Sequence, residues 1–573
     1  MPRNAGEAAV APPGCLSGMP SSSPDAWPWQ LDGGAWRFLL PPRPLERLLC
    51  YDNLGGATLP FAARLARDTL VVHHDPEEIA RLEALAQAAD MRGVRFARID
   101  GDREPAAFEA GFDAVVVHDP EARTLRRDRG PGPSLDALCA RASAALRPGG
   151  LLYLGFRNRF SYRRVRGARG AAPRLLSASA AATAMRRAGF ATRPPQPFLI
   201  EGPRVSELVT GSGYRSAKNP FLATERLREL VLRGWGSRHL APAYGVIGFR
   251  GPLEPSRLER LVADPWVQSL APGSVLRRCV VLQGTQLMLS LGPPLARHGA
   301  VILIVNAKPR LPDRQRSETA WLRRLAALSH EIASVIPVLH GEQEIDGFAV
   351  SAQSERPGMT VDHDAPFLPE LTARAARWLG EFHRATARPV PIDTELFRRA
   401  FAPLFAKASL RNPALVPEIA ALEQRVHARL TGRVLTLGWL HGDFKLENVV
   451  FDERTRALTG VIDWDLAWEP GPPLMDLLYL LLYDRVVRQR TDVLAACAAT
   501  VVRQEWTGEE RALIDAHHPA IGGERSLETA VGALFLVHHI GVRVTYDLAS
   551  AETLTELRDL LTALTARLVA ETS

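Results

Sequence analysis

The chain has 573 residues, more than one hydrophobic core normally holds, so two or three domains are expected. Its 46% hydrophobic and 23% charged residues are typical of a soluble globular protein. The net charge of +7 is spread over a large surface, which argues against nucleic acid as a partner and favours an arginine-rich solvated surface.

The cysteines and the apolar runs indicate where the protein works. Five cysteines lie far apart without C-x-x-C spacing, which argues against disulfides or a zinc site and indicates a reducing compartment. The run 477–483 is bounded by Asp476 and Asp484, so it predicts a buried helix rather than a membrane span. Residues 1–28 lack the apolar segment of a signal peptide and are expected to be a disordered leader. We therefore expect a cytoplasmic protein without a membrane partner.

Residues 29–252 alternate short apolar runs with helical segments, which predicts a first domain. Alternating strands and helices of this kind form a parallel sheet covered on both faces, an α/β Rossmann-like fold. The expected strands are 47–51, 69–73, 95–99, 114–117, 151–155 and 244–249, and the expected helices are 59–67, 76–89, 134–146 and 179–188.

Residues 253–573 have a different pattern and predict a second domain of α+β type. The expected strands 275–282, 286–291, 300–305 and 348–353 surround one helix, 314–328, and mostly helical sequence follows. Strands first and helices later indicate two lobes, a small antiparallel-sheet lobe at about 270–355 and a large lobe at about 356–573.

A cluster of polar residues in the large lobe carries the chemistry. His441-Gly442-Asp443 and Asn448 precede an apolar hairpin with its turn at 452–457, after which Asp463-Trp464-Asp465 follows. This layout predicts a loop, a strand, a turn and a second strand that ends in carboxylates. Phosphoryl transfer needs a carboxylate to orient the attacking hydroxyl and hard oxygen ligands for Mg²⁺. A chance loop with a buried structural Asp and His is the alternative.

The segments 441–448 and 462–465 resemble the H-G-D-x-x-x-x-N and I-D-W-[DE] motifs of the aminoglycoside phosphotransferase and choline kinase family, which has a protein-kinase-like fold. The resemblance implies Asp443 as catalytic base with His441 supporting its loop, and Asn448 and Asp463 as metal ligands. It also implies a structural role for Asp476. ATP and Mg²⁺ are the implied cofactors, and a small-molecule hydroxyl is the implied acceptor.

The nucleotide site of the small lobe is less distinct. The resemblance places a phosphate-holding lysine at Lys308 and its glutamate partner at Glu318, which shares a helix face with Trp321, Leu322 and Leu325. A surface lysine and a surface glutamate are the alternative. A glycine-rich phosphate loop is not evident, and Gly284 alone could bring backbone close to phosphate.

The N-terminal domain is similar to class I methyltransferases that use S-adenosylmethionine. The segments that carry this similarity are 51–56, 71–76, 112–116 and 146–152. It implies a glycine turn at Gly55 and carboxylates at Asp75 for the ribose and Asp100 for the adenine. The glycine motif is reduced, and the side chain of Leu59 is expected to crowd the methionine end of the cofactor.

Three interpretations stay open at this point. The first, which we favour, is an ATP- and Mg²⁺-dependent phosphotransferase acting on a sugar, an amino alcohol or an aminoglycoside-like molecule, fused to a degenerate methyltransferase-like domain. The second is a methyltransferase with a regulatory kinase-like half, and the third is a scaffold of two inactive domains. The adjacent pairs His73-His74, His517-His518 and His538-His539 are expected to be structural or surface histidines, since neighbours in sequence point apart.

Overall fold

The structure is a computed structural model of the chain. It describes residues 35–51, 59–88, 90–99, 111–118, 134–157, 177–202, 205–208, 241, 243–282, 286–293, 299–306, 313–361, 365–521, 527–542 and 551–571.

The N-terminal part is a Rossmann-like sheet with helices on both faces, as predicted. Its strands lie in the order β3-β2-β1-β4-β5-β9-β7; β1 to β5 run parallel and β9 runs antiparallel between β5 and β7. The strands are β1 Leu45–Tyr51, β2 Ala66–His73, β3 Val94–Arg98, β4 Phe112–His118, β5 Leu146–Arg157, β6 Ala191–Thr192, β7 Gln196–Gly202, β8 Val205–Leu208 and β9 Ala243–Phe249. The helices are η2 Ala35–Leu39, α1 Leu59–Leu65, α2 Pro76–Ala88, α3 Leu135–Ala145, α5 Ala178–Arg187, α8 Arg257–Ala263 and α9 Pro265–Leu270.

Alternation along the strands explains why both faces are covered. In β1, Leu48 and Cys50 join a core with helices α1, α2 and α8, whereas Leu49 and Tyr51 join a second core with α3 and α5. Successive side chains of a strand point to opposite faces, so an all-apolar strand has to be covered on both sides.

The small lobe is an antiparallel sheet with one long helix packed beside it. Its strands are β10 Val275–Leu282, β11 Gln286–Gly292, β12 Val301–Asn306, β13 Leu339–Ile345 and β14 Phe348–Ser354, and its helices are α10 Asp313–Leu325 and α11 His330–Ala333. Strand β13 was not predicted, whereas the other four lie where the apolar runs placed them.

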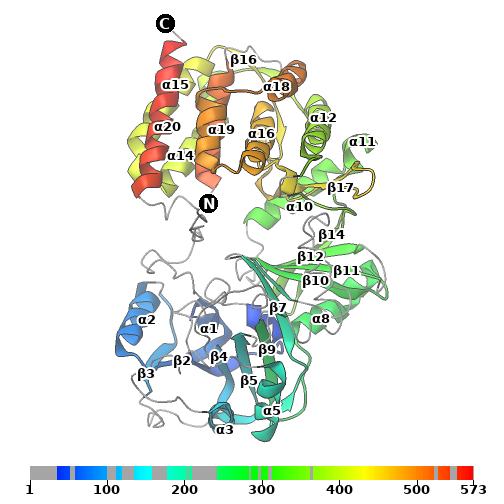
Figure 1. Ribbon diagram of the computed structural model, residues 1–573, viewed down its shortest axis with the longest axis vertical. Helices are drawn as coiled ribbons and strands as arrows, with labels where there is room; N and C mark the ends of the chain where they lie inside the picture. The colour runs from blue at the N-terminus through cyan, green and yellow to red at the C-terminus, as the bar shows by residue number, and fades with distance from the viewer. Residues whose placement is uncertain are drawn as a thin grey trace, which may run out of the picture.

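The small lobe and the Rossmann-like part share one sheet. Strand β8 pairs antiparallel with β10 through residues 205–208 and 279–282, so 14 strands of the described part of the chain form one continuous sheet (Figure 1). The core beneath it is also shared, because Phe38 and Leu48 belong to the same apolar cluster as Leu289 and Phe348. The boundary predicted at residue 252 remains a prediction, and the sheet continues across it.

Replacing Phe38 tests this shared core. Phe38 is fully buried and its ring centroid lies 5.8 Å from that of Phe348 in the small lobe. We expect Phe38→Ala to lower the free energy of unfolding by about 3–5 kcal/mol, because a buried ring is lost and a cavity remains. Denaturant unfolding measures the change, and Leu253→Ala at an exposed position is the control, expected within about 0.5 kcal/mol of the wild type. A loss below about 1 kcal/mol for Phe38→Ala would contradict the packing.

The large lobe is mostly helical, as predicted, around short strands that hold the loop 441–448. Its helices are α12 Leu368–Thr386, α13 Thr394–Ala400, α14 Ala402–Arg411, α15 Val416–Leu430, α16 Leu474–Gln489, α17 Val493–Cys497, α18 Gly508–Ile521, α19 Glu528–Val542 and α20 Ala551–Ala570. Its strands are β15 Arg388–Pro391, β16 Val434–Leu440, β17 Val449–Phe451, β18 Leu458–Val461 and β19 Trp468–Gly471. Strands β15, β16 and β19 were not predicted.

Two further predictions concern apolar and sulfur-containing residues. The run 477–483 lies in α16 and residues 477–482 are buried, as expected. Within the described residues, no helix is both long and apolar enough to cross a membrane. The four cysteines among the described residues are buried and form no disulfide: Cys50, Cys139, Cys279 and Cys497.

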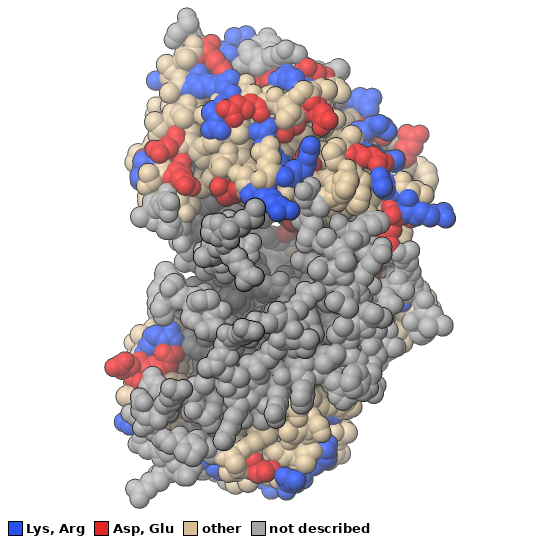
Figure 2. Space-filling view, viewed as in Figure 1, with Lys and Arg blue, Asp and Glu red and all other residues tan. Residues whose placement is uncertain are grey.

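Acidic and basic side chains are mixed on the large lobe. Figure 2 shows Lys and Arg interspersed with Asp and Glu over its visible face, rather than gathered into a patch of one sign. This distribution agrees with the solvated surface that the composition predicted.

Candidate active site

The loop 441–448 connects β16 to the β17–β18 hairpin and ends in a short 3-10 turn, η7 (Leu446–Asn448). Asp463 follows β18 and precedes a second turn, η8 (Trp464–Leu466). The backbone N–H of Ile462 donates to the carbonyl of Asn448 at 3.0 Å, so the end of the hairpin lies beside the end of the loop. The predicted loop, hairpin and carboxylate ending are therefore confirmed.

Asp443 is held by the other end of its own loop. Asn448 Nδ2 donates to the carbonyl of Asp443 at 2.9 Å and lies 3.3 Å from its Oδ2. The residue is 6% exposed, so its carboxylate is mostly shielded from bulk water. A shielded carboxylate in a fixed orientation is suited to direct the hydroxyl of an acceptor.

Lys445 is a site residue that the sequence reading missed. Its Nζ lies 3.2 Å from Asp443 Oδ2 and 3.2 Å from Glu447 Oε2, and the residue is 8% exposed. A buried lysine is rare unless it is paired. Its position in the sequence could have identified it, because Lys445 follows Asp443 by two residues in the loop that was predicted to act in phosphoryl transfer.

The carboxylate of Asp476 binds the backbone at the start of this loop. Its fully buried carboxylate accepts the backbone N–H of His441 at 2.7 Å and that of Gly442 at 2.9 Å. His383, also fully buried, brings Nε2 to 3.4 Å from the same carboxylate. Asp476, for which the resemblance implied a structural role, therefore holds the backbone of the loop at His441 and Gly442.

His441 links the loop to the hairpin. Its Nε2 lies 2.9 Å from the carbonyl of Ile462, and the backbone N–H of Asp443 points to its Nδ1 at 3.4 Å. His441 therefore connects the segment before Asp463 to the segment before Asp443, as a supporting residue would.

Gly442 occupies a conformation that requires glycine. Its φ is +78°, and a Cβ built there would lie 2.2 Å from the carbonyl oxygen of Leu466. We expect Gly442→Ala to lower both the melting temperature and the activity, because the strain of about 1–3 kcal/mol adds to a backbone clash. Gly508→Ala is the control, since a Cβ there meets nothing within 4 Å. Equal melting curves for the two variants would contradict the required conformation.

Asp463 and Glu318 lie where helix α10 of the small lobe packs against η8 of the large lobe. Asp463 has φ 68° and ψ 58°, a left-handed conformation that is uncommon outside glycine and occurs at functional sites. Helix α10 packs against η8, and its residues Glu318 and Leu325 are buried as predicted. Burial, and then the carboxylates of Asp463 and Asp465, raise the pKa of Glu318 to about 8.

These groups fit a divalent cation that is also held by a ligand. Neighbouring carboxylates destabilise one another's ionised forms, and a bound cation offsets this repulsion. Mg²⁺ binds oxygen ligands and usually keeps several waters or phosphate oxygens in its coordination shell. The oxygen atoms available here are those of the Asn448 amide and the Asp463 carboxylate. In the described part of the chain, no cluster of three or more His, Cys, Asp or Glu residues could hold a metal ion by itself.

Helix α10 is fixed to both lobes by polar contacts. On the small-lobe side, Gln315 Nε2 donates to the carbonyl of Ile304 at 3.0 Å and to Ser351 Oγ at 2.8 Å. On the large-lobe side, Arg324 Nη2 lies 2.5 Å from Glu469 Oε1, and its guanidinium lies 4.5 Å from the ring centroid of Trp439. These contacts determine where Glu318 is held.

Four predicted site residues fall outside the described residues: Gly55, Asp100, Gly284 and Lys308. The pairing of Lys308 with Glu318 therefore remains a prediction.

Two residues that were predicted to lie near S-adenosylmethionine, Asp75 and Leu59, are among the described residues. Asp75 lies after β2 at the carboxyl edge of the sheet, where its Oδ1 accepts the backbone N–H of Glu77 at 3.1 Å and caps α2. The expectation for Leu59 was wrong, because its side chain is 1% exposed and packs into the core under the sheet.

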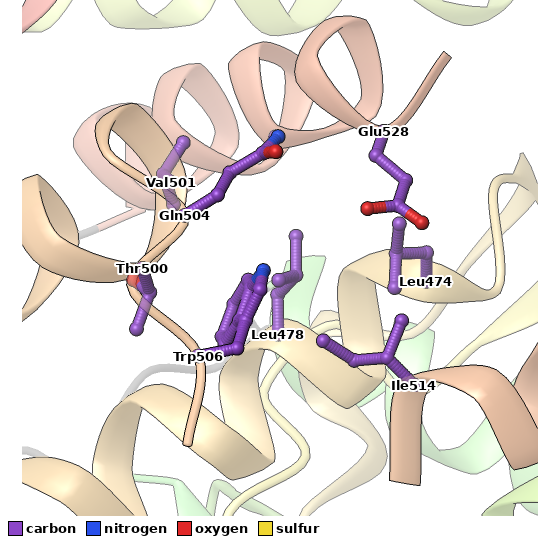
Figure 3. A pocket seen from close by; sticks show the side chains of 9 residues that line it. Leu474, Leu478, Thr500, Val501, Gln504, Trp506, Ile514 and Glu528 are labelled. Carbon is purple, nitrogen blue, oxygen red and sulfur yellow. The ribbon is translucent and has the colours of Figure 1, made fainter. Parts of the chain in front are cut away.

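A small cavity lies elsewhere in the large lobe. It is lined by Leu474 and Leu478 of α16, with Gln504, Trp506 and Glu528 around it (Figure 3). Its volume of about 10 Å³ admits roughly one water molecule, far less than a nucleotide or a sugar. This cavity is therefore not the acceptor site.

Comparison with protein families decides the class of the C-terminal part. Residues 295–512 match the model of the phosphotransferase enzyme family, a range that contains the loop 441–448, Asp463 and Asp476. These residues form a phosphotransferase-family domain. No curated protein matches the chain.

Solved structures resemble each half of the chain. The aminoglycoside phosphotransferase APH(3'')-Id from Streptomyces rimosus is 16% identical, with a TM-score of 0.32, over 48% of this chain and 96% of that chain. A SAM-dependent methyltransferase from Aquifex aeolicus is 10% identical, with a TM-score of 0.24, over 39% of this chain and 97% of that chain.

Proposed function

We propose that the phosphotransferase domain transfers the γ-phosphoryl group of ATP to a hydroxyl of a small molecule. The observation that carries this proposal is the buried Asp443 carboxylate, oriented by Asn448 and Lys445 on a loop anchored at Asp476. Such sites work mainly by positioning and by electrostatic stabilisation of the transferred group, and this arrangement supplies both.

Each residue has a defined part in the transfer. Asp443 orients the acceptor hydroxyl and takes its proton as the oxygen–phosphorus bond forms and the bond to the β-phosphate oxygen breaks. Lys445, beside Asp443, places a positive charge where the phosphoryl oxygens carry negative charge. His441 and Asp476 keep the loop in register with Asp463.

Mg²⁺ would be held by Asn448 and Asp463, and when bound it supplies charge neutralisation of the ATP phosphates. Glu318 would hold Lys308 toward the phosphates. The observation behind this role is its burial on α10, whose face against η8 lies close to Asp463 and Asp465.

The acceptor is proposed to be a neutral or singly charged hydroxyl compound, such as a sugar or an amino alcohol. A polycationic aminoglycoside would favour a site lined with free acids. The acids after helix α16 lie near arginines and are not free: Glu510 Oε2 is 2.5 Å from Arg485, Glu505 is 2.7 Å from Arg503, and Glu509 is 3.9 Å from Arg488.

An acceptor screen tests the proposed function. The full chain is incubated with Mg-ATP and a panel of sugars, amino alcohols and aminoglycosides, and formation of ADP above the acceptor-free rate is followed. Acceptor-dependent turnover with at least one class supports the proposal. No turnover and no Mg-ATP-induced rise in melting temperature would sink it, and would favour the interpretation of an inactive scaffold.

A second function concerns the Rossmann-like part. We infer that it binds S-adenosylmethionine, because its parallel strands end at one edge with Asp75 beside β2, where a carboxylate suits a ribose diol. The test is ligand-induced stabilisation by S-adenosylmethionine, lost in Asp75→Ala. A shift with this ligand but none with Mg-ATP would instead support a methyltransferase with a regulatory kinase-like half.

A further inference from the structure

A histidine outside the family-matched range contacts the catalytic loop. His538 lies in α19, beyond residues 295–512, and its Nε2 is 3.2 Å from the carbonyl oxygen of Gly442. The residue is 6% exposed; its ring stacks on Trp468 with centroids 6.0 Å apart and meets the ring of Tyr479 edge-on at 6.1 Å. The ring is therefore held in place by the packing of the helical tail.

This contact completes the fixation of Gly442. Asp476 accepts the N–H of Gly442 at 2.9 Å, while His538 faces its carbonyl, so both polar backbone groups of the residue before Asp443 have partners. Glycine lacks a Cβ to restrict its dihedrals, so the direction of its carbonyl depends on such outside contacts. A rotation of the peptide group between Gly442 and Asp443 would also change the orientation of Asp443.

The protonation state suits a donor at Nε2. Burial lowers the pKa of His538 to about 4, so the imidazole is neutral at ordinary assay pH. A neutral ring carries one N–H, and a carbonyl can only accept, so the N–H is on Nε2.

We propose that His538 is a positioning residue for Asp443, which makes helix α19 a working part of the phosphotransferase site. The inference rests on the proposed function and adds to it a residue that lies outside the family-matched range. Its neighbour His539 offers a matched comparison, because it is 1% exposed on the same helix but packs its ring against Phe535 and Tyr479.

The experiment compares the full-length wild type with His538→Phe, His538→Leu, His538→Gln and His539→Phe. Phe and Leu remove the donor, whereas Gln brings a side-chain N–H close to the position of Nε2. We expect Phe or Leu at 538 to lower kcat about 10- to 100-fold with the KM for ATP within about twofold, because misplacement of a catalytic group affects the chemical step. Gln at 538 is expected to restore most of kcat, and His539→Phe to leave it nearly unchanged.

Hydrogen exchange of the peptides covering 441–448 provides a readout that does not need an acceptor. Exchange in this segment should rise in the Phe and Leu variants at 538 but not in His539→Phe at equal melting temperature. Equal kcat and equal exchange in the 538 and 539 variants would overturn the inference, as would failure of Gln to rescue. If the wild type shows no ATP-dependent transfer, only the proposed function is contradicted. Hydrogen exchange of residues 441–448 would still show whether His538 holds the loop. Two donor-free variants keep the test available if one of them fails to fold.

Discussion

Asp443→Asn is expected to lower kcat for phosphoryl transfer by about 10²- to 10⁴-fold, the contribution of a positioned general base. Asparagine has nearly the shape of aspartate and keeps a polar group beside Lys445 and Asn448, which lie 3.2 and 3.3 Å from Asp443 Oδ2. The KM for ATP should therefore change little, since the loss falls on the transition state. Acceptor-dependent ADP formation at saturating ATP measures the effect.

Glu447→Gln is the matched control for this change. Glu447 is a carboxylate of the same loop that also lies 3.2 Å from Lys445, but its side chain is 49% exposed. Glu447 is half exposed and Lys445 keeps its contact with Asp443, so this variant should keep nearly full activity. Similar losses in the two variants would show that charge on the loop, rather than the position of Asp443, is what matters.

Asp463→Asn is expected to remove most Mg²⁺-dependent nucleotide binding and to lower kcat by about 10²-fold or more. Asparagine tolerates the left-handed conformation of Asp463, so the variant loses the charge without new backbone strain. At a ligand concentration of about 100 Kd, Mg-ATP should stabilise the wild type by about 2.7 kcal/mol. The variant should gain much less.

The control for this experiment is Asp452→Asn, in the turn of the neighbouring hairpin. There Oδ1 accepts the backbone N–H of Thr455 at 2.7 Å, a contact that an asparagine oxygen can also make. This variant should keep the Mg-ATP-induced rise in melting temperature. The metal assignment fails if Asp463→Asn keeps a wild-type rise that still depends on Mg²⁺.

Local pattern in the sequence determined the elements and the core of the active site. Apolar alternation located most strands because it reflects burial on one or both faces of a sheet. The spacing of Asp443 and Asn448 placed both in one loop, and the hairpin after them had to return Asp463 to the same place. These contacts span few residues, so the chain alone carries them.

The tertiary structure decided the contacts between distant segments. The pairing of β8 with β10 joins two regions into one sheet, and the side chains of Asp476 and His538 hold a loop that lies 34 and 96 residues away from them. Leu59 turned into the core rather than toward the cofactor edge. These contacts and orientations depend on which surfaces are buried against one another when the whole chain packs. A local sequence pattern does not contain that information.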